Sequence, residues 1–446
     1  MKRTASIFSL VFSLLCVLIT GCRKDEVTAQ EDNDLFIPRI FKETLLFPAT
    51  TQILNIGQTV DFSGLSYSPA DLAQISWKVN DKEVSTIKDY KFIPTEGGDF
   101  RVKLDVSYQG KTSSRFADFF VLPNSYTPKT YTNVMLSYLT ENGSASNIDW
   151  NTVTHVAYKV ATVTAAGVFD VSKGEVNRKA DELVGRAHIN GVPVLLGISG
   201  ALSADGWSVS SSNNFGAVLT DVTKRAALVQ SIKAYITLKK MDGVDVMMTD
   251  INSTTAIINA NIAATGLFIT ELRAALGTQA IITATVTSNT YYSRYPDLSI
   301  ANWVNVHAFE DGTHVGPGIA LGQPSSYNYM VSSAALWKTK LPGAKLVIGI
   351  PAFGLRYNTL DANGNNLSWA SYNYIPYSEI LTAVPDAFDK EYANISKGVY
   401  FNGIPLVTQK GTYLKANGFL GAYIWAGDYD VKGAKSLTAT LFSTLK

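Results

Sequence analysis

The chain has 446 residues, 46% of them hydrophobic, and its 38 Lys and Arg residues almost balance its 37 Asp and Glu residues. The formal charge of +1 and the lack of a basic stripe argue against a nucleic acid partner. Only four histidines occur, and none lies in a metal-binding spacing such as His-Glu-x-x-His. We therefore expect neither a metal ion nor another cofactor.

The N-terminus predicts a secreted and lipid-anchored protein. Lys2 and Arg3 precede an apolar run from Ile7 to Ile19, which is shorter than the about 20 residues of a membrane-spanning helix and is typical of a signal peptide. The run ends in Leu-Ile-Thr-Gly-Cys, which resembles the lipobox of bacterial lipoproteins. The resemblance implies a signal peptide over residues 1–21 and lipidation of Cys22; an ordinary signal peptide with an incidental cysteine is the alternative.

The residues after Cys22 bear on location. Lys24-Asp25-Glu26 resembles the export signal of Bacteroidetes lipoproteins and implies an outer-membrane lipoprotein exposed at the cell surface. The only other cysteine, Cys16, lies in the signal peptide, so we expect no disulfide and no catalytic thiol in the mature chain.

Two segments precede the main domain. Residues 22–40 are polar and acidic and predict a flexible tether. Residues 41–122 contain short stretches in which apolar and polar residues alternate, as in 74–81 and 98–108, and they resemble Ig-like or polycystic-kidney-disease-like β-sandwich modules. We expect a spacer, followed by a linker over 123–130. The side chains expected to face inward are Trp77, Phe100, Val102, Leu104 and Val106.

Residues 131–446 change to buried strands that alternate with helices such as 224–240. Near-continuous apolar strands are typical of a parallel sheet covered on both sides, and eight β/α units predict a (β/α)8 TIM barrel. The working face of such a barrel lies at the carboxyl ends of its strands. The predicted strands are 133–139, 154–163, 192–200, 243–248, 280–288, 303–310, 345–354 and 419–427.

Motifs on five of these strands resemble family 18 of the glycoside hydrolases, the chitinases and endo-β-N-acetylglucosaminidases. The segment MDGVDVMMT, which begins at Met241, is similar to the first half of the family pattern Asp-x-x-Asp-x-Asp-x-Glu. The other matches follow in chain order: LLGISG (195–200), VNVHAFE (304–310), LVIGIPAFGLRY (346–357) and GAYIW (421–425).

The departures from the family pattern bear on catalysis. Because residues i, i+2 and i+4 of a strand share a face, Asp245 and the two residues at 247 and 249 are expected to point into the barrel mouth. The resemblance implies an aspartate and an acid-donating glutamate at the last two positions, but Met247 and Thr249 stand there. Acid–base catalysis contributes about 10²–10⁴ in rate. We expect no catalytic residue of the family type, with Asp250 and Glu310 as the carboxylates that remain for a rebuilt mechanism.

The predicted sugar-binding residues are better preserved. Trp425 occupies the place of the tryptophan that floors the family's sugar pocket, and Glu310 follows the sixth strand, where it is able to bond hydroxyls. Aromatic rings stack on the apolar faces of pyranoses, so we expect rim contacts from some of Tyr291, Tyr292, Tyr295, Trp369 and Tyr372, with Tyr374 and Tyr377 as packing residues. The complete predicted glycan site is Tyr138, Trp207, Asp245, Phe309, Glu310, Arg356, Trp425 and Asp428.

Three interpretations follow. The first is a non-catalytic surface lipoprotein that captures oligosaccharides containing N-acetylglucosamine, of the chitin or N-glycan type, for a neighbouring hydrolase or importer of a polysaccharide-utilisation system. The second is an active family 18 hydrolase with a replaced acid. The third is a surface adhesin or scaffold whose barrel binds protein.

Overall fold

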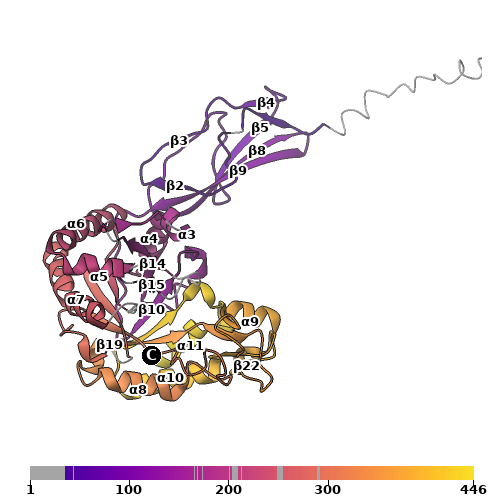
Figure 1. Cartoon of the computed structure of the whole chain (residues 1–446). Coiled ribbons are helices and arrows are strands. Elements are labelled where there is room, and N and C mark those ends of the chain that lie inside the picture. The colour runs from indigo at the N-terminus through magenta and orange to yellow at the C-terminus, as the bar shows by residue number, and fades with distance from the viewer. Residues whose placement is uncertain are drawn as a thin grey trace, which may run out of the picture. The chain divides into compact units, whose positions relative to one another are not determined.

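The structure is a computed structural model that describes residues 36–43, 45–164, 166–167, 169–172, 174–199, 201–202, 209–211, 213–248, 255–288 and 292–446. The signal peptide, Cys22 and residues up to 35 lie outside these ranges. The chain forms two compact units, an N-terminal all-β unit and a C-terminal α/β unit (Figure 1). No helix within the described ranges combines the length and the apolarity needed to cross a membrane.

The N-terminal unit consists of strands only, as predicted. Its sheets pair β1 with β4 and β3 with β7, and a five-stranded sheet has the order β2-β9-β8-β5-β6. Arg39 and Ile40, which were assigned to the tether, instead lie in β1. The strands are β1 (Arg39–Phe41), β2 (Gln52–Asn55), β3 (Val60–Asp61), β4 (Ser66–Ser68), β5 (Gln74–Val79), β6 (Lys82–Ser85), β7 (Lys91–Phe92), β8 (Gly98–Tyr108) and β9 (Lys111–Leu122).

The core of this unit forms on the inward faces that the alternation predicts. Trp77 is fully buried, stacks on Tyr90 at 5.2 Å between ring centroids, and donates Nε1–H to the carbonyl of Ile87 at 3.1 Å. Val102, Leu104 and Val106 of β8 are also fully buried, whereas Phe100 is only partly buried. The all-β character is confirmed, and the likeness to an Ig-like or polycystic-kidney-disease-like module stays a prediction.

The C-terminal unit is a closed barrel of eight parallel strands, which confirms the (β/α)8 prediction. The order is β10-β24-β19-β18-β17-β16-β13-β11, and pairing of β10 with β11 closes it. Every predicted strand is present; the strand predicted at 243–248 has its ends in place, and the others have at least one end shifted by a few residues. The strands are β10 (Val134–Leu139), β11 (His155–Val163), β13 (Val194–Ser199), β16 (Gly243–Met248), β17 (Ile281–Thr287), β18 (Trp303–His307), β19 (Leu346–Pro351) and β24 (Gly421–Trp425).

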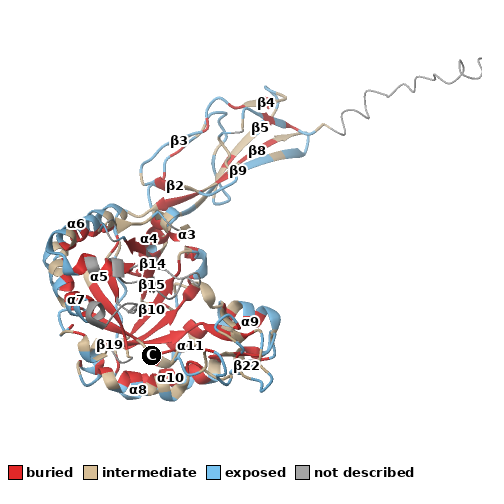
Figure 2. Ribbon diagram, in the orientation of Figure 1, coloured by how far each residue is buried: buried red, intermediate tan, exposed pale blue. Residues whose placement is uncertain are grey.

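Helices surround this barrel, and Figure 2 shows buried strands inside with exposed outer helix faces. The predicted helix 224–240 is α6, which Asp221 caps by accepting hydrogen bonds from two backbone amides. The helices are α3 (Gly174–Arg178), α4 (Ala180–Ile189), α5 (Asn213–Thr220), α6 (Val222–Lys239), α7 (Thr255–Leu276), α8 (Tyr327–Trp337), α9 (Tyr377–Ala383), α10 (Ile404–Ala416) and α11 (Leu437–Leu445). Short strands β12 (Phe169–Asp170), β14 (Ala201–Leu202) and β15 (Val209–Ser211) lie in the connections.

An antiparallel sheet interrupts the barrel between β19 and β24, and the sequence analysis did not anticipate it. The predicted strand 345–354 is in fact two elements, because β19 ends at Pro351 and β20 (Phe353–Tyr357) belongs to the inserted sheet. The order there is β21-β20-β23-β22, with β21 (Tyr372–Pro376), β22 (Tyr392–Ala393) and β23 (Val399–Phe401). The insertion therefore begins directly at the carboxyl end of a barrel strand.

A lysine is fully buried behind this insertion. Lys410 of α10 has no exposed surface, and its Nζ donates to the carbonyl of Ser325 at 2.7 Å and to Oδ1 of Asn402 at 2.5 Å. Burial lowers the pKa of Lys410 to about 7, although the negative charge of Glu391 opposes this shift. The neutral amine retains two N–H donors, which match the two acceptors.

We expect the stability of the protein to depend on the charge of Lys410. Between about pH 7 and pH 10.5 the unfolded chain binds a proton that the folded chain does not, so the free energy of unfolding rises with pH by about 1.4 kcal/mol per unit from this group. Urea denaturation at pH 7.5, 8.5 and 9.5 measures the slope, and Lys410→Met removes this part of it. The exposed Lys415 on the same helix provides the control, since Lys415→Met leaves the slope unchanged. Equal slopes in all three proteins would contradict the expectation.

Candidate functional site

The centre of the barrel holds a buried carboxylate with four side-chain partners. Asp245 has no exposed surface, and its Oδ1 accepts hydrogen bonds from Thr283 (2.6 Å) and Asn305 (3.1 Å). Its Oδ2 accepts from the hydroxyls of Tyr138 (2.7 Å) and Thr285 (2.8 Å). Burial raises the pKa of Asp245, while these hydrogen bonds act in the opposite direction. The carboxylate is therefore a structural centre with no surface for a ligand.

Strand register explains why these side chains meet. Asp245 pairs with Thr283 across β16 and β17, and Thr285 pairs with Asn305 across β17 and β18. Paired residues of neighbouring strands point to the same face, here the barrel interior. Trp303 donates Nε1–H to Oδ1 of Asn305 at 2.9 Å, which leaves the Asn305 amide nitrogen for Asp245 and Tyr138.

Met247 points into the barrel where the sequence analysis placed it. It is 3% exposed, lies opposite Thr285 in the register, and belongs to one apolar cluster with Tyr138, Phe309 and Trp425. Its thioether thus occupies the interior position that the family pattern gives to an aspartate. Thr249 and Asp250, on which the rest of the catalytic prediction depends, lie outside the described residues.

A chain of aromatic rings crosses the carboxyl ends of the strands. Trp425 packs on Tyr138 at 4.9 Å between ring centroids, and Tyr138 contacts Tyr423 at 5.1 Å. The Nε1–H of Trp425 is buried and has no hydrogen-bond partner among the described atoms. A buried donor without a partner costs free energy, so this group is suited to an acceptor supplied by a ligand.

Glu310 lies beside these rings, three residues after β18. Its Oε2 is 3.5 Å from Nε2 of His307, and the side chain of Tyr374 lies beside its carboxylate. The ring of His307 packs on Phe309 at 3.8 Å between centroids. Burial, and then the negative charge of Glu310, raise the pKa of Tyr374. The cluster combines a carboxylate, an imidazole and a phenol in one wall of the barrel end.

The backbone at Glu310 is unusual. Its φ is +64°, in the left-handed region that residues with a Cβ rarely adopt, and its amide donates to Oγ of Ser325 at 3.2 Å. Such strained residues concentrate at functional sites. The left-handed backbone conformation of Glu310 costs conformational free energy and directs its carboxylate inward.

Besides Asp245, which is buried and so is not the predicted glycan contact, the structure changes the role of three other predicted contacts. Tyr138 is fully buried, so it supports Trp425 from below and cannot face a sugar ring. Asp428 accepts hydrogen bonds from the backbone amide and the hydroxyl of Thr140, and so fastens the segment after β24 to the end of β10. Arg356 donates to Oδ1 of Asn373 at 3.1 Å, and the ion-pair partner found for Glu310 among the described residues is His307.

The rim aromatics divide into packing and exposed residues. Tyr295 is buried against Trp337, and Tyr292 packs edge-on to the same ring, so neither offers a sugar platform. Tyr377 is a packing residue as expected, whereas Tyr374 contacts Glu310 and is more than packing. Trp369 is 68% exposed. Trp207 and Tyr291 lie outside the described residues.

The sequence analysis missed two contributors. Phe353 of the inserted sheet lies between Phe309 and Tyr374, at 5.9 and 5.2 Å between centroids, and extends the aromatic wall. Lys159 of β11 is fully buried two residues after the interior residue Ala157, so it shares the inward face. A lysine inside an apolar strand was a visible signal, whereas the place of Phe353 depended on the unrecognised sheet. In the described ranges no three His, Cys, Asp or Glu side chains are grouped as metal ligands.

The C-terminal unit is a (β/α)8 barrel with its candidate site residues at the carboxyl ends of the strands. Solved chitinases have the same fold. The sequence pattern of the glycosyl hydrolases family 18 matches residues 112–430, which is most of the chain. The chain therefore belongs to family 18, and the resemblance stated from its motifs is confirmed.

Solved structures show the same fold. A chitinase from Bacteroides thetaiotaomicron has a TM-score of 0.57 and 22% identity, covering 71% of this chain and 97% of that chain. A family 18 chitinase from the chitin utilization locus of Flavobacterium johnsoniae has a TM-score of 0.56 and 22% identity over 71% and 94%. A class V chitinase from Nicotiana tobaccum, in complex with NAG4, has a TM-score of 0.57 and 18% identity over 70% and 99%. No functionally curated protein matches the chain significantly in sequence.

We expect the left-handed backbone of Glu310 to be a measurable strain. Glu310→Gly and Glu310→Ala both remove the carboxylate, but only glycine relaxes at φ +64°. The glycine variant is therefore more stable than the alanine variant by about 1 kcal/mol in urea denaturation. Equal stabilities would show that the backbone is not strained there.

Proposed function

We propose that the protein is a non-catalytic binding protein for oligosaccharides that contain N-acetylglucosamine, of the chitin or N-glycan type. Membership of family 18 supports this ligand class, since a solved structure with the same fold binds NAG4. The observation that carries the non-catalytic part is Met247, an apolar side chain at the interior position of the fourth strand that the family pattern gives to an acid. Thr249, two residues further on, is too weak an acid to protonate a leaving group near neutral pH.

The candidate contacts are the groups that line the carboxyl end of the barrel. The unpartnered Nε1–H of Trp425 suits a carbonyl or hydroxyl oxygen of the ligand, and the carboxylate of Glu310 suits sugar hydroxyls. The partly buried Tyr374 places a phenol beside Glu310. Together these groups supply one donor, one acceptor and an aromatic wall, the combination with which proteins bind pyranoses.

The first test is native mass spectrometry of the chain from residue 23 onward, incubated for hours with chitooligosaccharides and N-glycans. We expect intact complexes and no cleaved masses. Trp425→Phe keeps an aromatic ring but removes Nε1–H, so it weakens binding about tenfold, and Trp425→Ala weakens it further. Phe116→Ala, at an exposed ring of the all-β unit, is the matched control and leaves binding unchanged.

The opposite outcomes identify the alternatives. Cleaved glycans would establish an active hydrolase with a replaced acid, and loss of cleavage in Asp250→Ala or Glu310→Ala would name that acid. If only the family acids are missing, Met247→Asp with Thr249→Glu creates cleavage in a protein that otherwise only binds. If the protein neither binds nor cleaves any of these glycans, the result favours an adhesin or scaffold. The protein partner of such an adhesin would bind equally well after substitution of Trp425.

The cellular setting belongs to the same proposal. We place the protein at the outer membrane, facing the cell exterior, anchored through a lipid on Cys22 and next to a glycan importer or hydrolase. The lipobox-like residues and Lys24-Asp25-Glu26 support this placement.

We expect Cys22→Ser to release the protein from the outer-membrane fraction and to abolish incorporation of labelled palmitate. Cys16→Ser, within the predicted signal peptide, is the matched control and changes neither result. Labelling that persists in Cys22→Ser would overturn the lipid anchor.

A further inference from the structure

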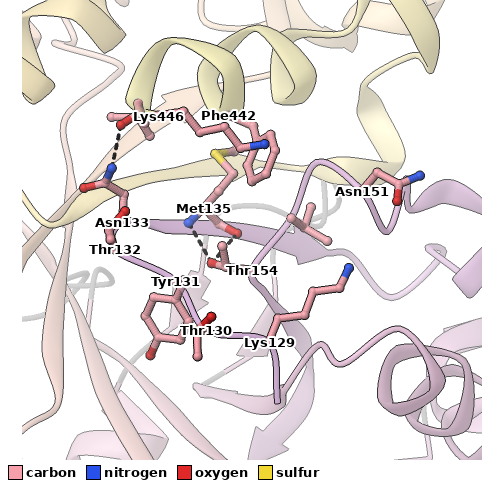
Figure 3. Close-up of a pocket in the computed structure, with 12 residues that line it drawn as sticks. Lys129, Thr130, Tyr131, Thr132, Asn133, Met135, Asn151, Thr154, Phe442 and Lys446 are labelled. Carbon is pink, nitrogen blue, oxygen red and sulfur yellow. Dashed lines mark hydrogen bonds between the residues drawn. The ribbon is translucent and has the colours of Figure 1, made fainter. Parts of the chain in front are cut away.

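A cavity lies at the opposite end of the barrel from the candidate glycan site. Its volume is about 310 Å³, at the small end of the range of ligand pockets. It is formed where β10 and β11 begin and where α11 ends (Figure 3). The lining residues are Lys129, Thr130, Tyr131, Thr132, Asn133, Met135, Asn151, Val153, Thr154, Phe442, Leu445 and Lys446.

The inner part of the cavity is apolar. Met135, Val153 and Leu445 are almost fully buried, and the partly buried ring of Phe442 packs against the same core. Thr154 is held by the backbone of Met135, since its hydroxyl accepts from that amide at 2.8 Å and donates to that carbonyl at 3.1 Å. This polar group is therefore satisfied within the protein, and the base of the cavity is suited to a hydrocarbon group.

The rim of the cavity carries two lysine side chains that pair with no described side-chain carboxylate. Lys129 and Lys446 are exposed, and Figure 3 shows them on opposite sides of Met135 and Thr154. The Nζ of Lys129 contacts the carbonyl of Trp150 at 3.3 Å, and that of Lys446 lies over the ring of Phe442 at 4.1 Å. Neither forms an ion pair with a described carboxylate, and no Asp or Glu side chain lines the cavity.

We infer that this cavity binds a small amphipathic anion, an aliphatic carboxylate whose chain enters between Met135 and Phe442 and whose charge meets the two lysines. The exposed amide of Asn151 and the hydroxyls of Thr130 and Thr132 are additional donors for the carboxylate. The site is separate from the barrel mouth, so the inference does not depend on the proposed glycan binding.

The probe is a series of straight-chain carboxylates, butanoate, hexanoate and octanoate, titrated calorimetrically into the chain from residue 23 onward. We expect affinity to increase about fourfold for each methylene that enters the cavity. Because the charge is recognised near the surface, affinity also falls as the salt concentration rises. Octanol, which has the chain but not the charge, binds about tenfold more weakly than octanoate.

Variants locate the site. Lys129→Ser with Lys446→Ser weakens octanoate about tenfold while both positions remain exposed. Lys397→Ser with Lys415→Ser, which removes the same charge from two other exposed positions, leaves octanoate binding unchanged. Chitooligosaccharide binding is the independent readout, and the Lys129 and Lys446 double variant leaves it unchanged.

Three results would overturn the inference. They are the absence of saturable octanoate binding, equal weakening by the two double variants, and displacement of octanoate by N,N′-diacetylchitobiose. The last would mean that the cavity is a second sugar site. A failure of glycan binding with normal octanoate binding would overturn the proposed function alone.

Discussion

The buried carboxylate of Asp245 is the constraint on which the rest of the barrel interior depends. A carboxyl group without exposed surface is tolerated only when hydrogen bonds replace those that it makes to water, and four side chains from β10, β17 and β18 do so. Each donor is in turn positioned by strand register, so one side chain links three strands besides its own. Because each oxygen of Asp245 accepts from two of these side chains, removing one donor would leave that buried oxygen with a single hydrogen bond.

The buried Asp245 also gives a physical reason for the apolar side chain at the next interior position of β16. Two carboxylates in neighbouring interior positions repel each other and force one of them to hold a proton. Met247, two residues after Asp245 on the same face, introduces no such second charge and packs with Tyr138, Phe309 and Trp425. The interior thus holds one carboxylate with a complete set of donors. Glu310 lies on a different element, the segment after β18, and has its own neighbours His307 and Tyr374.

The barrel was predictable because its strands are long apolar runs separated by helical segments, and β16 was predicted with its ends in place. The inward direction of Asp245 and Met247 followed from period-two alternation. The inserted sheet was not predictable in the same way, since LVIGIPAFGLRY reads as one apolar run although the chain leaves the barrel after Pro351. Likewise, Tyr138 and Asp428 were suitable residue types near the right place, but only packing revealed that Asp245 and Thr140 already use their polar groups.

The buried Lys410 is connected to Glu310 through one shared residue, Ser325. Ser325 accepts a hydrogen bond from Lys410 through its carbonyl and one from the amide of Glu310 through its hydroxyl, so a single residue separates the two. Since the pKa of Lys410 is about 7, acidification of the medium places a cation directly behind the support of Glu310. A charge on Lys410 would therefore arise one residue away from the backbone support of Glu310, although the lysine itself has no exposed surface.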